Sequence, residues 1–383
     1  MQTHERSYMG EMLDSENSTA IEKSKNRNYA IDLLRCVSMG MITIHHVLLH
    51  GGILEGAQWL SPQYSVSWLL EIASLCAVNV YGLISGYVGF GKRNRYSRII
   101  FLCLQVSFYT IISTVVLATL GLEIVNIGTI RNAIFPFAYD TYWYFNAYFC
   151  LFFMMPFLNK LVSALSEREI KCLLVTMLFV FSVLQTLLDS QFALTNNGYS
   201  FLWLALMYIT GASIRKLGIE GAKLNCYLQG YFLSVLIMWF TRMGIENVAY
   251  KISNTEVQFK QFVTYTSPFM VICAICLVIA FAKMELNRGC VKATMILSPV
   301  AFDVYLLQDE PHVRNALISG AFVKYLYFQP GFMVLAILET ALVIFTAGIA
   351  VGSVRTLVFK ALKVEEVCEK MEAKLLQFYQ RVL

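Results

Sequence analysis

An arginine and a histidine lie on one face of the first apolar segment of the chain. Arg35 and His46 are eleven residues apart, close to three full turns of an α-helix, so their side chains point the same way about 16 Å apart along the axis. Ionisable groups inside an apolar helix are costly and commonly mark functional sites. A structural alternative is that Arg35 reaches back to Asp32 while His46 is a hydrogen-bonded core residue. That alternative does not explain the shared face, so both residues are site candidates.

A carboxylate at a similar depth is the expected partner of this histidine. Glu71 lies near the outer end of the second apolar segment, and His46 lies at a similar depth in the first. If the two helices are adjacent and antiparallel, Glu71 can orient the imidazole of His46, as in base-activated acyl transfer. His46 and Glu71 are therefore the candidate catalytic residues.

Two arginines follow the second apolar segment. Arg95 and Arg98 are three residues apart at the start of a predicted helix, which places their guanidinium groups on neighbouring positions of one face. Two such groups suit a multiply charged phosphate ligand. A basic loop is equally what a cytoplasmic position alone would require, so both interpretations stay open on spacing.

Aromatic and polar residues gather where two other apolar segments meet the outer surface. Tyr142, Trp143 and Asn146 open the fourth segment, and Gln308 and Asp309 close the ninth. An interfacial aromatic belt explains most of the first group, but stacked aromatic rings also suit a sugar ring. The second group indicates a break in the helix that lines a wet cavity. All five are candidate substrate-binding residues.

The composition indicates a membrane protein. The 383 residues are 57% hydrophobic and 14% charged, with a mean hydropathy of +0.60, whereas soluble chains are about 45–50% apolar and about 25% charged. A spanning helix needs roughly 20 mostly apolar residues. Such segments lie near 29–50, 66–90, 98–120, 141–159, 170–188, 199–217, 226–245, 263–282, 293–309 and 331–354. They predict an all-α integral membrane protein with about ten transmembrane helices, of which the ninth is bracketed or broken by Pro299 and Pro311.

Charge in the loops predicts the orientation. The loops 91–98, 160–171, 215–224 and 283–292 hold thirteen Lys and Arg residues, and the five alternate loops hold six. By the positive-inside rule the first set faces the cytoplasm. Basic residues before the first segment and after the last place both termini there too.

The ends of the chain differ from the apolar part in composition. Residues 1–27 form a polar tail, 28–354 the ten-helix membrane domain, and 355–383 a predicted amphipathic helix on the cytoplasmic membrane surface or below the bundle. No metal is expected, because the Cys273-x-x-Cys276 pair lies in an apolar run without His or acidic neighbours. No nucleic-acid partner is expected either.

Taken in order, these motifs resemble the acyltransferase-3 family, integral membrane enzymes that O-acylate carbohydrates. The resemblance covers roughly residues 27–354. The family's Arg-x10-His motif falls on Arg35 and His46, and its Arg-x-x-Arg motif falls on Arg95 and Arg98. Its small-residue motif falls on Leu83-Ile-Ser85-Gly86-Tyr87. The family's middle region resembles Tyr142-Trp143-Tyr144 with Pro156-Phe-Leu-Asn159. Where many members have Tyr-Leu-Ile-His, this chain has Tyr305-Leu-Leu-Gln308, which removes a titratable group and leaves an amide that can hydrogen-bond an acceptor.

The resemblance implies a membrane-bound O-acyltransferase of the bacterial plasma membrane. The acyl donor would be an acyl-CoA, with acetyl-CoA expected, whose phosphates bind Arg95, Arg98 and Arg35 from the cytoplasm. The distance from Arg35 to His46 is comparable to the reach of a pantetheine arm, so the thioester would lie near His46. The acceptor would be a hydroxyl of a cell-surface or lipid-linked carbohydrate. The alternative is a polytopic transporter or flippase, against which stand the ordered motifs and the lack of a visible inverted repeat.

Overall fold

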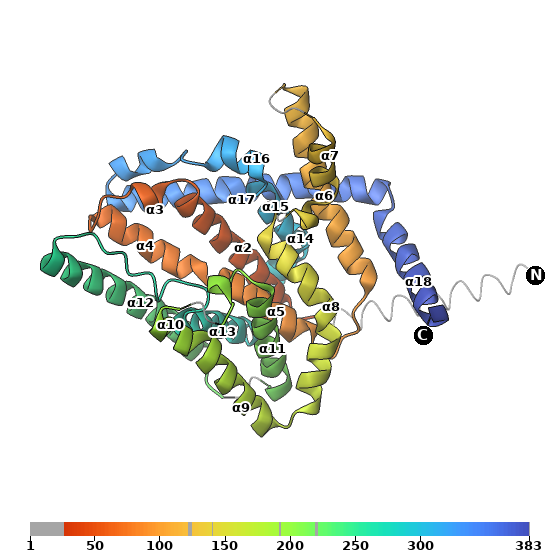
Figure 1. Cartoon of the computed structure of the whole chain (residues 1–383), viewed down its shortest axis with the longest axis horizontal. Helices are drawn as coiled ribbons and strands as arrows, with labels where there is room; N and C mark the ends of the chain where they lie inside the picture. The colour runs from red at the N-terminus through yellow and green to blue at the C-terminus, as the bar shows by residue number, and fades with distance from the viewer. Residues whose placement is uncertain (1–26, 122–124, 140, 191–192, 219–220, 383) are drawn as a thin grey trace, which may run out of the picture.

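The structure is a computed structural model that describes residues 27–121, 125–139, 141–190, 193–218 and 221–382 (Figure 1). These residues form helices joined by turns and loops, and no strand occurs among them. The predicted all-α fold is therefore confirmed. The predicted polar tail lies outside the described residues except for Arg27.

The first two predicted crossings coincide with helices of the structure. α2 (Tyr29–Leu49) begins where the Asn28 side chain accepts hydrogen bonds from the first backbone N–H groups of the helix. α4 (Pro62–Leu75) and α5 (Ala77–Gly89) together form the second crossing, with a break at Cys76. Both crossings start at residues that favour helix initiation, namely an Asn cap and a Ser cap followed by proline.

The remaining predicted crossings are also helical. They are α6 (Tyr96–Thr119), α8 (Trp143–Ala164), α9 (Glu167–Leu178) with η2 (Phe179–Leu184) and α10 (Gln185–Leu188), α11 (Phe201–Leu217), α12 (Leu224–Ser253), α13 (Pro268–Ala282), α14 (Arg288–Leu297) with α15 (Ala301–Gln308), and α17 (Pro330–Ala361). Within the described residues, eight helical segments are long and apolar enough to cross a membrane. The other two predicted crossings, α11 and α13, have 17 and 15 residues. The chain is an integral membrane protein, and the total of ten crossings stays a prediction.

Short helices fill the connections. They are α3 (Ile53–Gly56), α7 (Ile127–Ile134), η1 (Pro136–Ala138), η3 (Asn196–Gly198), α16 (Pro311–Val313), η5 (Arg314–Ile318) and η6 (Val323–Tyr327). The ninth crossing is broken as the prolines predicted, because η4 (Ser298–Val300) contains Pro299 and separates α14 from α15. Pro311 starts α16 just beyond the end of α15.

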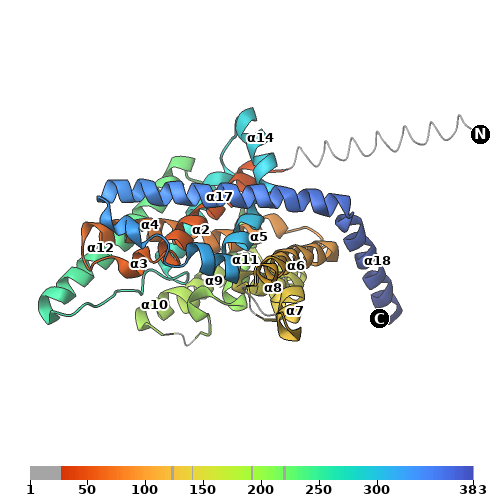
Figure 2. The ribbon, with the colours of Figure 1, turned by 90° about the horizontal axis from the view of Figure 1, so that it is seen from above.

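Close packing of α5 against α11 forms the centre of the bundle. A Cβ atom on Gly86 would lie 1.9 Å from the carbonyl oxygen of Tyr208, and one on Gly211 would lie 2.0 Å from that of Leu83. Only glycine permits backbones to approach this closely, as is common between membrane helices. α2 also lies inside the bundle, whereas α17 runs along its outside (Figures 1 and 2). The central helices therefore give fixed positions to the side chains on α2.

The basic loops meet at the bundle end from which α2 starts. The Asn28 side chain donates to the carbonyl of Ala282 at the end of α13, and Lys216 donates to carbonyls at the end of α8. These bonds agree with one common face for the loops rich in Lys and Arg. The side of the membrane on which that face lies stays a prediction.

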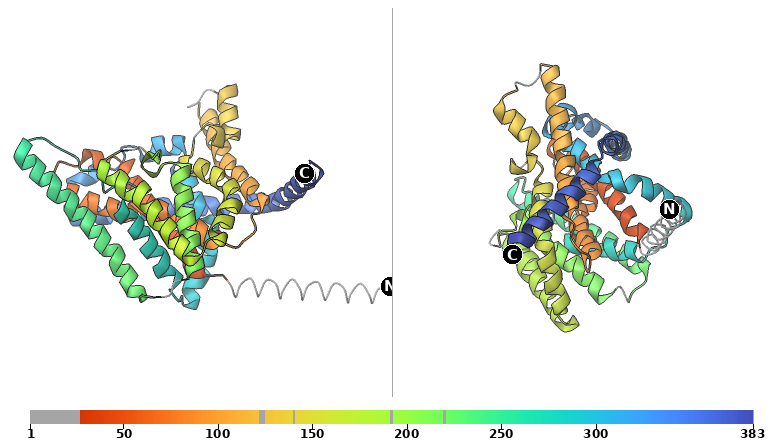
Figure 3. Two further views of the ribbon diagram at one scale, coloured as in Figure 1. Left: turned by 60° about the horizontal axis from the view of Figure 1, so that its bottom comes forward. Right: turned by 90° about the vertical axis from the view of Figure 1, so that its right-hand side faces the viewer.

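The C-terminal region differs from its predicted boundary at residue 355. α17 continues to Ala361, and a separate helix, α18 (Val364–Val382), follows a turn at Lys363. α18 leaves the direction of α17 (Figures 2 and 3). It lies against the start of α6, where its Glu369 accepts a hydrogen bond from Arg95 at 3.0 Å.

Candidate active site

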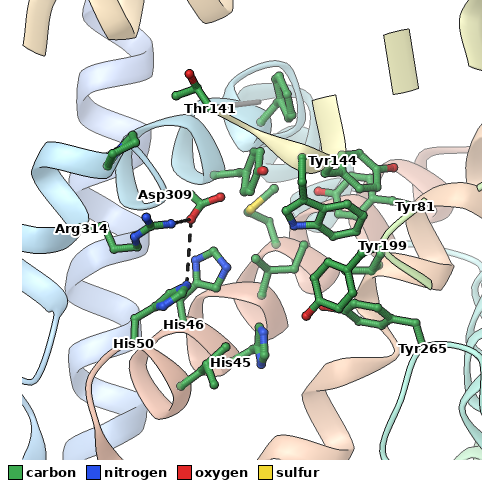
Figure 4. Close-up of a pocket in the computed structure, with 18 of the residues that line it drawn as sticks. His45, His46, His50, Tyr81, Thr141, Tyr144, Tyr199, Tyr265, Asp309 and Arg314 are labelled. Carbon is green, nitrogen blue, oxygen red and sulfur yellow. Dashed lines mark hydrogen bonds and ion pairs between the residues drawn. The ribbon is translucent and has the colours of Figure 1, made fainter. Parts of the chain in front are cut away.

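A cavity of about 460 Å³ lies at the junction of α2, α5, α8 and α15 (Figure 4). Its size falls in the usual range for small-molecule sites, about 300–1,000 Å³. One part of the wall is apolar, a second is aromatic, and a third carries charged and imidazole groups. These parts consist of Met39, Ile42 and Val78; of Trp143, Tyr144, Tyr199 and Tyr265; and of His45, His46, His50, Asp309 and Arg314.

One helical face of α2 leads from Arg35 to this cavity. Met39, Ile42 and His46 all line it, and Arg35 precedes them at the matching spacing. Arg35 does not line the cavity itself, but its carbonyl oxygen accepts a hydrogen bond at 2.8 Å from Tyr81, which does. The guanidinium group of Arg35 pairs with the carboxylate of Asp32. The predicted common face is therefore present, together with the ion pair of the structural alternative.

The partner predicted for Glu71 is wrong by one residue. His45 Nδ1 donates to Glu71 Oε1 at 2.8 Å, and both side chains are buried. Successive residues of an α-helix point about 100° apart, so the side of α2 that faces α4 carries His45 while His46 faces elsewhere. Because an imidazole hydrogen-bonded to a carboxylate is a familiar form of activated base, His45 becomes a second candidate base.

His46 instead adjoins a polar group that contains three further side chains. Its ring centroid lies 4.9 Å from that of His50, one helical turn away. His50 Nε2 lies 4.0 Å from Asp309 Oδ1, and Arg314 donates to the same oxygen at 2.9 Å. Figure 4 shows these groups together on one side of the cavity. Among the described residues, the buried His46 Nδ1 has no hydrogen-bond partner.

The electrostatics of this group favour a neutral His50. Burial and the positive charge of Arg314 lower the pKa of His50 to about 4. Burial raises the pKa of Asp309, and Arg314 opposes that rise. His50 and Arg314 are not among the site residues predicted from the sequence. The i, i+4 spacing of His46 and His50 was the signal for the first, since it places both rings on one face.

The same side chains could hold a metal ion. The candidate ligand atoms of His46, His50 and Asp309 all lie within 4.8 Å of one another. Nitrogen and carboxylate ligands in this number are typical of zinc sites. This candidate metal site differs from the cysteine pair, on which the expectation of no metal rested.

Only some of the residues predicted to bind the acceptor line the cavity. Trp143 and Asp309 line the cavity. Tyr142 lies behind the wall and donates to the carbonyl of Leu306 at 2.8 Å. Gln308 is buried outside the lining, and among the described residues its amide has no hydrogen-bond partner. Asn146 lies on α8 and is not part of the lining.

Two aromatic residues that the sequence analysis did not name complete this wall. The ring centroid of Trp143 lies 4.6 Å from that of Tyr199 and 6.1 Å from that of Tyr265. The two tyrosines come from separate loops, before α11 and before α13. Only the fold brings them together, so no local spacing could have indicated the group.

The arginines of the Arg-x-x-Arg motif lie away from the cavity. Arg95 directly precedes α6 and pairs with Glu369, and neither Arg95 nor Arg98 lines the cavity. Burial and the positive charges of Arg98 and Arg35 lower the pKa of Lys92 in the preceding loop. Arg35 and Arg98 therefore contribute to one positive region at the basic end of the bundle.

Comparison with protein families adds the last observation. Residues 28–355 match the family model Acyl_transf_3, which is described as an acyltransferase domain. The comparisons with curated proteins and with solved structures gave no match. The family match covers the whole membrane bundle, including the face of α2 and the cavity. The chain therefore belongs to the acyltransferase-3 family and is a multi-pass membrane acyltransferase.

Proposed function

We propose that the protein transfers an acetyl group from acetyl-CoA to a hydroxyl of a cell-surface or lipid-linked carbohydrate in the bacterial plasma membrane. One observation carries the proposal. A single face of α2 connects a positive region at the basic end of the bundle with a cavity in which imidazole and aromatic groups meet. In this proposal the positive region binds the donor phosphates and the cavity holds the reacting atoms.

The positive region is the proposed place for the phosphates of the donor. Besides burial, the positive charges of Arg98 and Arg35 lower the pKa of Lys92 there, and Arg95 lies at the start of the same helix as Arg98. Guanidinium groups bind phosphate through bidentate hydrogen bonds. The pantetheine arm then follows the face of α2 over about 16 Å, and the thioester carbon comes to lie beside His46.

His46 is the proposed general base. It accepts the proton of the acceptor hydroxyl while that oxygen attacks the thioester carbonyl, and the C–S bond breaks as the new C–O bond forms. CoA leaves as the thiolate and takes up a proton. His46 is preferred over His45 because His46 shares the face of Arg35 and has a buried nitrogen with no partner among the described residues. His45 is instead held by Glu71.

The aromatic wall is the proposed acceptor site. Trp143, Tyr199 and Tyr265 present neighbouring rings to the cavity. The faces of aromatic rings pack against the C–H side of a sugar ring, while Asp309 and Arg314 offer an acceptor and a donor to its hydroxyls.

The test supplies purified protein in proteoliposomes with acetyl-CoA labelled on the acetyl group and a panel of oligosaccharides. Wild-type protein should move label to the sugar, and His46→Ala should reduce the rate at least about 100-fold, the usual lower contribution of a general base. His45→Ala is the matched control and should retain most activity.

Two outcomes would contradict the proposal in different ways. Label that stays on CoA with every acceptor would favour transport over acyl transfer to sugars. A folded His46→Ala protein with full activity, beside an inactive His45→Ala protein, would move the base to the pair of His45 and Glu71.

A further inference from the structure

The three candidate metal ligands occupy the part of the cavity where the reaction is proposed to occur. His46 and His50 come from successive turns at the end of α2, and Asp309 follows the end of α15 (Figure 4). All their candidate ligand atoms lie within 4.8 Å of one another. Among the residues that the structure describes, no group hydrogen-bonds the buried Nδ1 of His46, and the 4.0 Å between His50 and Asp309 is too long for a hydrogen bond. The group thus has unused ligand capacity.

We propose that His46, His50 and Asp309 form a zinc site and that zinc bound there inhibits acyl transfer. Two imidazoles and one carboxylate are a ligand set that zinc accepts, with a fourth position left for water. A neutral imidazole has one available lone pair. When that pair binds zinc, His46 has none left for the proton of the acceptor. The inhibitory part of the inference rests on the proposed function, whereas the binding part does not.

The geometry indicates a site that closes around the ion rather than a permanently occupied one. Zinc–nitrogen distances of about 2.0–2.1 Å place tetrahedral ligands roughly 3.3 Å apart, so the three groups must move closer together. The side chain of His50 is 28% exposed and has room to move. Arg314 holds Asp309 at 2.9 Å and repels a cation. We therefore expect zinc to bind reversibly at this site.

Replacing Arg314 should change the zinc affinity in the opposite direction from replacing a ligand. Removing a ligand weakens zinc binding, but Arg314→Gln removes a positive charge and a competitor for Asp309. Arg314→Gln should therefore bind zinc more tightly than wild type. A general loss of folding would weaken binding in every variant, so it cannot imitate this pattern.

The experiment measures zinc binding directly, without any acyl transfer. Protein purified in detergent with a tag that lacks histidine is titrated with zinc in competition with a chromophoric chelator. Wild type should bind one zinc ion per chain. His50→Ala and Asp309→Asn should each weaken binding at least about tenfold. His45→Ala is the matched control, because this neighbouring imidazole is held by Glu71 and should not change the affinity.

Absence of binding to wild type, or equal binding by His50→Ala and Asp309→Asn, would overturn the zinc site. A loss of binding in His45→Ala as large as in His50→Ala would do the same. A parallel assay of labelled acetyl transfer should show inhibition over the zinc range that saturates the site and recovery with EDTA. Activity that zinc leaves unchanged or increases would overturn the inhibitory role. A wild type without transfer activity would refute the proposed function, while the titration would still decide the zinc site.

Discussion

Glu71 is connected to the cavity by its hydrogen bond to His45, which lines the cavity wall. Its carboxylate is buried beside a buried imidazole, so the two groups stabilise each other in a region of low dielectric. Removing one partner of a buried hydrogen bond leaves the other unsatisfied, which typically costs about 1–3 kcal/mol. We expect Glu71→Ala to lower the unfolding temperature in detergent clearly. The loss of acetyl-transfer rate in Glu71→Ala should be at least about tenfold smaller than the loss in His46→Ala.

A double-mutant cycle tests this assignment. The destabilisation by Glu71→Ala together with His45→Ala should be smaller than the sum of the two single effects, because both remove the same contact. Strict additivity would show that the pair is not coupled. A loss of activity in Glu71→Ala equal to that in His46→Ala would instead return Glu71 to the catalytic role predicted from the sequence.

Residue spacing predicts part of the site and fails at identifiable points. Arg35 and His46 share a helix, so a 3.6-residue period is enough to place them on one face. Glu71 was paired with the wrong imidazole because depth in the membrane does not distinguish two consecutive residues, whereas the direction in which α4 lies does. Tyr199 and Tyr265 were missed because no property of their own loops indicates that they meet.

At the scale of elements, α15 depends on one buried carboxylate for its position. α15 has eight residues, follows the break at η4, and carries Tyr305 into the cavity wall, with Asp309 directly after its end. Asp303 in its first turn accepts hydrogen bonds from Arg355 at 2.6 and 3.0 Å, and from Gln105 and Tyr109 at 2.8 Å each. This carboxylate therefore joins α15 to α6 and α17.

Removing one partner of this group should have a large effect. Arg355→Met leaves Asp303 buried without its cation, which typically costs about 3–5 kcal/mol, and should lower the unfolding temperature measured by intrinsic fluorescence in detergent. Asp303→Asn in the same chain removes the uncompensated charge and should restore part of the loss. A double variant no more stable than Arg355→Met alone would contradict this role.

Hydropathy predicts the positions of the elements better than their ends and partners. Every predicted crossing is helical, and Pro299 marks a real break. The helix of the last predicted crossing does not end at residue 354. Arg355 is buried against Asp303, so the helix continues beyond it to Ala361. A charge that finds a partner fifty-two residues away does not end a helix, and a local average cannot detect such a partner.

At the scale of the whole molecule, α18 covers part of the positive region. It lies outside the family match and contacts the start of α6 through its acidic side. Glu372 accepts a hydrogen bond from the backbone N–H of Tyr96 at 2.8 Å, and Glu369 pairs with Arg95. The first N–H groups of a helix and its dipole attract anions. The two carboxylates therefore occupy positions that suit the phosphates of the proposed donor.

Neutralising these carboxylates should strengthen donor binding. In a chain carrying Glu369→Gln and Glu372→Gln, the KM for acetyl-CoA should fall about threefold to tenfold, the size expected for a helix-terminal carboxylate that no longer competes. Glu365→Gln with Glu366→Gln is the matched control, since it changes the net charge equally on the first turn of α18, where both side chains are exposed. Added salt should reduce the difference between the two variants, because it screens the exposed charges of Glu369 and Arg95. An unchanged or higher KM in the first variant would mean that α18 supports the start of α6 without competing with the donor.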